Sequence, residues 1–136
     1  MSQTQIYQAL IQAVKDVPGM VPFSTAATPF TPPVNGAPYA DVTVFQNTPV
    51  VFTLGEDGDD MVEGFMQVLL KYPLDKGVLA SSRLGDTLRE SFKAGSRKFY
   101  ETQEVIIVRS GLGQPSTAEG KLVNPFTIYF YALIRR

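Results

Sequence analysis

The chain has 136 residues, a formal net charge of −1 and neither histidine nor cysteine. This length suits one domain, which we assign to residues 1–136. A charge so close to zero gives no long-range attraction to nucleic acid or acidic membranes, and no run of about 18 apolar residues is present to cross a bilayer. The missing cysteine excludes disulfides and thiolate metal sites.

Residues 4–17 are predicted to form the first helix. Their apolar side chains recur at helical spacing and so make one stripe. Ser2 or Thr4 can cap the start, because a hydroxyl accepts a hydrogen bond from a free N–H group of the first turn. Pro18-Gly19 then ends the helix. We expect this helix to pack on a sheet beside a second helix.

The segment that follows, residues 20–38, contains five prolines and is predicted to be a long irregular loop. It also contains Phe23 and Phe30, which are unusual in a simple linker. These rings either hold the loop against the core or contact a partner, and the sequence leaves both readings open.

Three strands are predicted next. Residues 39–46 and 50–54 are short strands, and the Asp57-Gly58 turn indicates that 50–54 pairs antiparallel with the beginning of 60–73. Apolar residues alternate along 60–73 with the period of a strand that has one face in a core. The predicted core face consists of Val62, Gly64, Met66, Val68, Leu70 and Tyr72.

A second helix is predicted from Val78 to Phe92, after a turn at 74–77 in which Asp75 can cap it. The apolar period changes here from two to about four, which is typical of a β-α unit. The predicted stripe consists of Ala80, Leu84, Leu88 and Phe92. Ser81 and Gly85 are small, so this helix can lie close to the strand before it.

The last part of the chain is predicted to contain two strands, residues 99–109 and 122–134, separated by a polar loop at 110–121. We expect segments 24–38 and 111–121 to be mobile in the free protein and to become ordered on assembly. The expectation follows from their length and their content of Pro, Gly and Ser.

These elements predict an α+β fold in the order α-β-β-β-α-β-β: a mostly antiparallel or mixed sheet with two helices on one face. Two helices cover only one face, so apolar side chains on the other face need cover from the loops or from another subunit. The candidate interface residues are Phe23, Phe30, Phe65, Leu69, Leu112, Tyr129 and Tyr131.

No pattern in the sequence supports catalysis, metal binding or a cofactor. The acidic turn at 56–60 lacks the alternate ligand spacing of a calcium loop. Gly111-Leu112-Gly113 lacks the third glycine of a phosphate-binding loop. Without His or Cys, the commonest general base and the commonest soft nucleophile are missing. We therefore expect a non-enzymatic protein without metal or cofactor.

The order of short motifs along the chain resembles that of a known family. Thr53-Leu54-Gly55 is followed by 63–68, Tyr72-Pro73 and Gly77, and then by a helix ending at Phe92. This pattern is similar to that of the tail terminator, or tail completion, proteins of long-tailed bacteriophages, the minor tail protein U-like family. The resemblance covers nearly the whole chain and rests on Gly, Pro and apolar positions.

The resemblance implies a structural virion protein at the head–tail junction, assembled in the host cytoplasm. Such a protein caps the tail tube as a hexameric ring, stops tube polymerisation and offers a surface for head joining. The implied partners are other copies of itself, the tail tube protein and a head-completion or connector protein. The alternatives are a head–tail connector or neck subunit and, in a different class, a small ligand-binding or enzymatic α+β domain.

Overall fold

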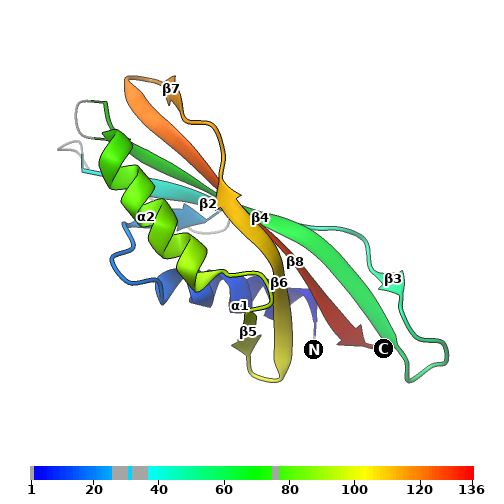
Figure 1. The fold of residues 1–136 in the computed structure, drawn as a ribbon. Coiled ribbons are helices and arrows are strands. Elements are labelled where there is room, and N and C mark those ends of the chain that lie inside the picture. Colours follow the sequence, from blue (N-terminus) through cyan, green and yellow to red (C-terminus); the bar gives the residue numbers. More distant parts are fainter. Residues whose placement is uncertain (1, 26–30, 32–36, 75–76) are drawn as a thin grey trace.

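The computed structural model of the chain describes residues 2–25, 31, 37–74 and 77–136. The elements in chain order are α1 (Gln3–Lys15), β1 (Phe23–Thr25), β2 (Tyr39–Gln46), β3 (Val50–Val51), β4 (Asp59–Pro73), α2 (Gly77–Ser91), β5 (Arg97–Tyr100), β6 (Gln103–Leu112), β7 (Ser116–Ala118) and β8 (Lys121–Arg135) (Figure 1). The predicted α+β class and the predicted order of elements are confirmed, with three short strands added.

The strands form one mixed sheet in the order β1-β2-β4-β8-β6-β5, with β3 on the side of β4 and β7 on the side of β8. Among the described strands, only β1 and β2 pair in parallel. β4 and β8 are both 15 residues long and pair along their whole length, from Asp59 with Arg135 to Pro73 with Lys121. At about 3.3 Å per residue this central ladder is about 50 Å long.

The two helices lie on one face of this sheet (Figure 1). α1 packs on β5 and β6, and α2 packs on β4, β6 and β8. The predicted face of β4 is in the core, where Val62, Met66, Val68 and Leu70 are fully buried. Leu84, Leu88 and Phe92 of the predicted helical stripe are buried too, whereas Ala80 is exposed and lies outside the core.

Individual side chains explain where α1 begins and how α2 packs. Ser2 is the N-cap of α1, and its hydroxyl accepts a hydrogen bond from the Gln5 N–H at 3.2 Å. Small residues bring α2 close to β8 and β6: Ser81 is fully buried and its Oγ accepts a 2.6 Å hydrogen bond from Asn124 Nδ2 of β8. A Cβ at Gly85 would collide with the side chain of Leu112, which therefore lies against α2.

Four boundaries differ from the prediction. Residues 99–109 are not one strand, because the chain reverses at Glu101, whose positive φ of 53° ends β5 and begins a hairpin with β6. Segment 110–121 is not simply a loop, because β6 continues to Leu112 and β7 pairs with the first three residues of β8. Within 20–38, residues Phe23–Thr25 form β1.

The fourth difference is β3, which stops at Val51 instead of Leu54. The N–H groups of Phe52 and Thr53 both donate to the Asp59 carbonyl, at 2.9 and 3.0 Å, so the chain turns here instead of extending the ladder. The predicted pairing of this strand with β4 is confirmed by Val50–Met61 and Val51–Asp60. The predicted Asp75 cap and most of the 24–38 segment lie outside the described residues.

Candidate functional site

A row of aromatic rings crosses the sheet on the face opposite the helices, which we call the open face. Phe45 of β2 lies opposite Phe65 of β4, which lies opposite Tyr129 of β8, which lies opposite Arg109 of β6. The rings of Phe45 and Phe65 stack at 4.7 Å between centroids, and Phe65 and Tyr129 are 6.0 Å apart. The Arg109 guanidinium lies 4.1 Å above the Tyr129 ring. This row is an apolar surface made by cross-strand neighbours.

Beside the aromatic row lies a groove of about 610 Å³. A β-bulge between Ile107 and Arg109 helps to shape it, because the bulge brings Arg109 to the same face as the half-exposed Val108. The apolar lining consists of Phe52, Met61, Phe65, Val108, Tyr129, Phe130 and Tyr131, and the polar lining of Asn47, Glu63 and Arg109. The groove is therefore a mostly apolar surface with one cation and one anion.

A second apolar surface lies at the end of the sheet, on the segment we call the β3 arm (residues 50–60). Four of its apolar side chains, Val50, Val51, Phe52 and Leu54, are between 57% and 92% exposed. Figure 1 shows that this segment projects beyond the helices. The arm buries little of its own apolar surface, so its shape needs polar contacts.

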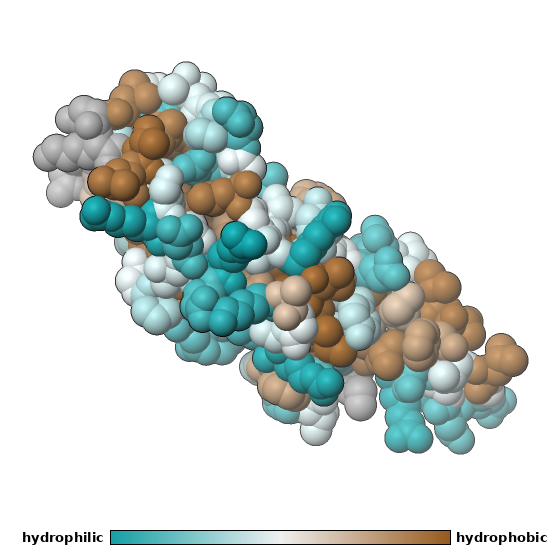
Figure 2. Space-filling view, in the orientation of Figure 1, coloured by the Kyte–Doolittle hydropathy of each residue, from teal (hydrophilic) through white to brown (hydrophobic). Residues whose placement is uncertain are grey.

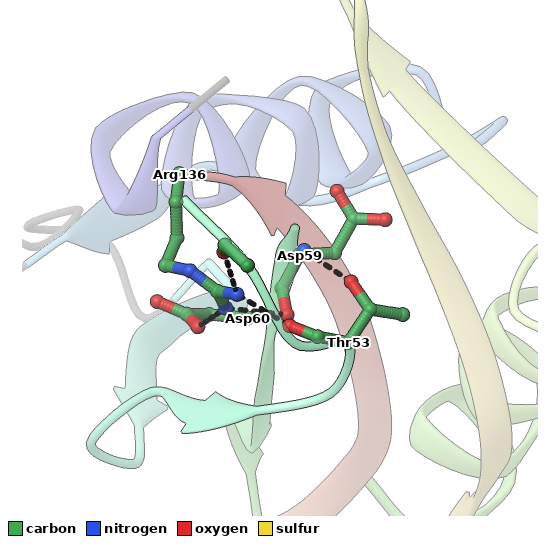
Figure 3. Close-up of polar contacts among 5 residues, drawn as sticks. Thr53, Asp59, Asp60 and Arg136 are labelled. Atoms are coloured by element: carbon green, nitrogen blue, oxygen red, sulfur yellow. Dashed lines mark hydrogen bonds and ion pairs between the residues drawn. The ribbon is translucent and has the colours of Figure 1, made fainter. Parts of the chain in front are cut away.

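Arg136 supplies those contacts (Figure 3). Its Nη1 donates to the Asp60 carboxylate and, at 2.9 Å, to the Asp59 carbonyl. Its Nη2 donates to the Thr53 carbonyl and, at 2.5 Å, to the Gly55 carbonyl. The Arg136 side chain is only 25% exposed. One guanidinium thus holds both strands of the arm and its turn.

A polar cluster lies at the other end of the open face. Lys71 Nζ is 2.8 Å from Asp41 Oδ2, and Ser24 Oγ donates to Asp41 Oδ1 at 2.5 Å. Burial alone would raise the pKa of Asp41, but the hydrogen bonds from Lys71 and Ser24 outweigh burial and lower it. The hydrogen bond with Asp41 likewise raises the pKa of Lys71. Both Lys71 and Lys121 lie over the Tyr39 ring. The cluster ties β1 to the central strands.

The structure brings some of the predicted interface residues together and separates others. Phe65, Leu69, Tyr129 and Tyr131 share the open face of β4 and β8. Phe23 instead packs against the core from β1, and Leu112 lies beside α2. Phe30 lies outside the described residues.

Sequence analysis missed several residues of this surface: Phe45, Phe52, Val108, Arg109 and Arg136. The period-two pattern of residues 39–46 carried a signal for Phe45, because Val42 and Val44 point to the core and Phe45 must then point the other way. The positions of Arg109 and Arg136 depend on a bulge and on a distant turn, for which local spacing gives no signal.

Within the described part of the chain, no three or more Asp and Glu side chains gather closely enough to hold a metal ion. Over the same residues, no helix has the length and apolar character needed to cross a membrane.

Extensive exposed apolar surface of this kind is typical of proteins that assemble with other proteins. A family model described as "Phage tail terminator protein" matches residues 5–130. The chain therefore belongs to the phage tail terminator family, and it is a structural component of a phage tail. As a tail terminator, it interacts with other proteins of the phage tail and head.

Comparison with solved structures supports the fold independently. One solved chain superposes with a TM-score of 0.74 at 21% identity, and the match covers 98% of this chain and 96% of the other. At this identity the likeness concerns the fold alone. A comparison with curated protein sequences found no match.

Proposed function

We propose that the protein ends the growing tail tube by forming a six-membered ring on its last layer, and that the ring offers the surface for head joining. Its partners are then the tail tube protein and a head-completion or connector protein, and it is located at the head–tail junction of the virion. Membership of the tail terminator family supports this role. The observation that carries the proposal is the aromatic row on the open face, because Phe45 and Tyr129 in this row stay 47% and 37% exposed among the described residues.

Multivalency explains how such a protein can stay soluble and still bind firmly. The end of a tube is a ring of repeated sites, so a matching ring makes many contacts at once. Contacts that are weak singly then become strong together. A ring also needs one patch on each protomer to meet a different patch on its neighbour. The open face and its groove offer one such patch.

A charge on the open face tests the proposal. Tyr131 lies on this face and lines the groove, so Tyr131→Glu adds a carboxylate to the surface that the proposal uses. We expect the variant to fold with an unchanged circular dichroism spectrum but to form no rings in size-exclusion chromatography or electron microscopy. Thr102→Glu, at an exposed turn between β5 and β6, adds the same side chain elsewhere and should form rings normally.

Deleting the gene tests the role itself. Phage without the protein should make tubes of uncontrolled length with unattached heads. Tubes of normal length without attached heads would indicate a connector or neck subunit instead. Normal tubes joined to heads would refute both roles.

A further inference from the structure

Besides the open face, exposed apolar side chains gather in two places that lie at opposite ends of the protein. The first is the tip of the β3 arm, with Val50, Val51, Phe52 and Leu54. The second, which we call the α2 end, consists of Leu74 after β4 and of Val78 and Leu79 in the first turn of α2, which are 52–63% exposed. Figure 2 shows apolar surface over the beginning of α2 at upper left and over the β3 arm at right.

The two clusters cannot meet within one protomer. β3 pairs with the first residues of β4, at Asp60 and Met61, whereas Leu74 directly follows the last residue of β4. The clusters are thus separated by the length of a 15-residue strand, which is about 50 Å. That strand is paired along its whole length with β8 and cannot fold back. Any contact between the clusters must therefore join two molecules.

The arm is held in a fixed shape, which favours a role in binding. Arg136 fixes the arm through four hydrogen bonds, including those to Thr53 and Gly55 on either side of Leu54. Leu54 itself is 92% exposed. A rigid loop that presents an apolar side chain loses little conformational entropy when it binds. The Arg136 contacts thus preorganise Leu54 for insertion into another surface.

Charge also suits a contact between these ends. The arm carries Glu56, Asp57, Asp59 and Asp60, and among the described ion pairs only Asp60 has a cation, Arg136. At the α2 end, Arg83 is exposed one turn after Leu79 and belongs to none of those ion pairs. An acidic arm tip that meets Arg83 gains a charge contact, whereas two acidic arms would repel each other, so the charges favour arm-to-α2 over arm-to-arm association.

From these observations we propose that the β3 arm of one protomer docks on the α2 end of a second copy. The inference rests on the proposed ring and adds a second contact between its protomers, beside the contact on the open face. Each protomer gives its arm to one neighbour and receives the arm of the other, so the contact is heterologous and closes into a ring. Seven side chains bury less than the roughly 800 Å² per partner of a stable pair, so one junction is weak and the closed ring is favoured.

Disulfide trapping tests the junction, and the chain suits it because it has no cysteine of its own. The double variant Leu54→Cys/Leu79→Cys places one thiol at each end of the protomer. Tails isolated from phage carrying this variant are treated with an oxidant and separated on a non-reducing gel. We expect a ladder extending beyond dimers up to the closed ring, whereas either single variant should stay monomeric on the gel.

The control is Leu54→Cys/Thr102→Cys, which moves the second thiol to the exposed β5–β6 turn. The 54–79 crosslink should form at least about tenfold faster than the 54–102 crosslink, since docking raises the effective concentration of the paired thiols. Mixing the two single variants, Leu54→Cys and Leu79→Cys, should give dimers that contain one of each.

Equal rates for the two pairs, dimers of Leu54→Cys alone, or rings without a 54–79 crosslink would overturn the junction. Failure of the junction differs from failure of the proposed function. In the first case the protein is still in tails of correct length but its crosslinks lie elsewhere. In the second case tails reach their normal length and join heads without the protein.

Discussion

Replacing Arg136 by alanine should loosen the β3 arm without unfolding the protein. The side chain donates to the Asp60 carboxylate and to the carbonyls of Thr53, Gly55 and Asp59. A partly exposed hydrogen bond contributes about 0.5 kcal/mol, and an exposed ion pair adds little. The four together therefore stabilise the closed arm by about 1–2 kcal/mol. The core does not depend on them, because none of the fully buried side chains lies on the arm.

Hydrogen exchange reports this change directly. The amides of Phe52 and Thr53 bond the Asp59 carbonyl, and the amide of Gly58 bonds the Gly55 carbonyl, so all three are protected only while the arm is closed. A loss of 1–2 kcal/mol should accelerate their exchange by about 5- to 30-fold. The amide of Val68, in the middle of β4, should exchange at its original rate.

Arg135→Ala is the matched control, because it removes the same charge one residue earlier from an exposed side chain that belongs to no described ion pair. It should leave the arm amides unchanged. Arg136→Lys should give an intermediate result, since a lysine keeps the charge but cannot bridge several carbonyls as a planar guanidinium does. Arm amides that stay fully protected in Arg136→Ala would refute the assignment of Arg136 as the residue that fixes the arm.

Two further predictions concern the folded protomer. Leu88 is fully buried between α2 and the sheet, so Leu88→Ala should lower the free energy of unfolding, measured in urea, by about 2–5 kcal/mol. Arg83→Ala, on the exposed side of the helix, should lower it by under about 0.5 kcal/mol. A small loss for Leu88→Ala would mean that α2 is oriented differently. Because the pKa of Asp41 is lowered in the folded state, its pair with Lys71 stabilises the protein above the ordinary Asp value of 3.8 and loses this effect as pH falls through the lowered value. Asp41→Asn should remove that part of the acid dependence of Tm, and an unchanged acid limb would contradict it.

The sequence predicted those features that depend on short-range periodicity. Alternation along β4 identified the buried Val62, Met66, Val68 and Leu70, and the four-residue spacing in α2 identified Leu88 and Phe92. Both patterns work because a strand and a helix each turn their side chains with a fixed period. The uncovered face of the sheet was predicted from the number of helices, because two helices can cover only one side of the sheet.

Features that depend on distant contacts were missed. The guanidinium of Arg136 contacts residues 76 to 83 positions earlier, so nothing in its own neighbourhood indicates its role. Ser116–Ala118 became β7 only because β8 offers a free edge there, and its three exposed residues show no alternation. The reversal at Glu101 occurs without the glycine or asparagine that usually marks a positive φ.

The end of the sheet that carries the β3 arm is not covered by a helix, because the two helices are shorter than the central strands. β4 and β8 each extend about 50 Å, whereas α1 with 13 residues and α2 with 15 are only about 20 and 22 Å long. The helices therefore stabilise only part of the central ladder, and no other described helix is available to cover its arm end. Within one strand, β4, some residues thus stabilise the protomer and others form the surface for assembly. Even-numbered residues of β4 such as Met66 pack under the helices, and odd-numbered ones such as Phe65 face outward. A protein built in this way can change its partner surface without losing its core.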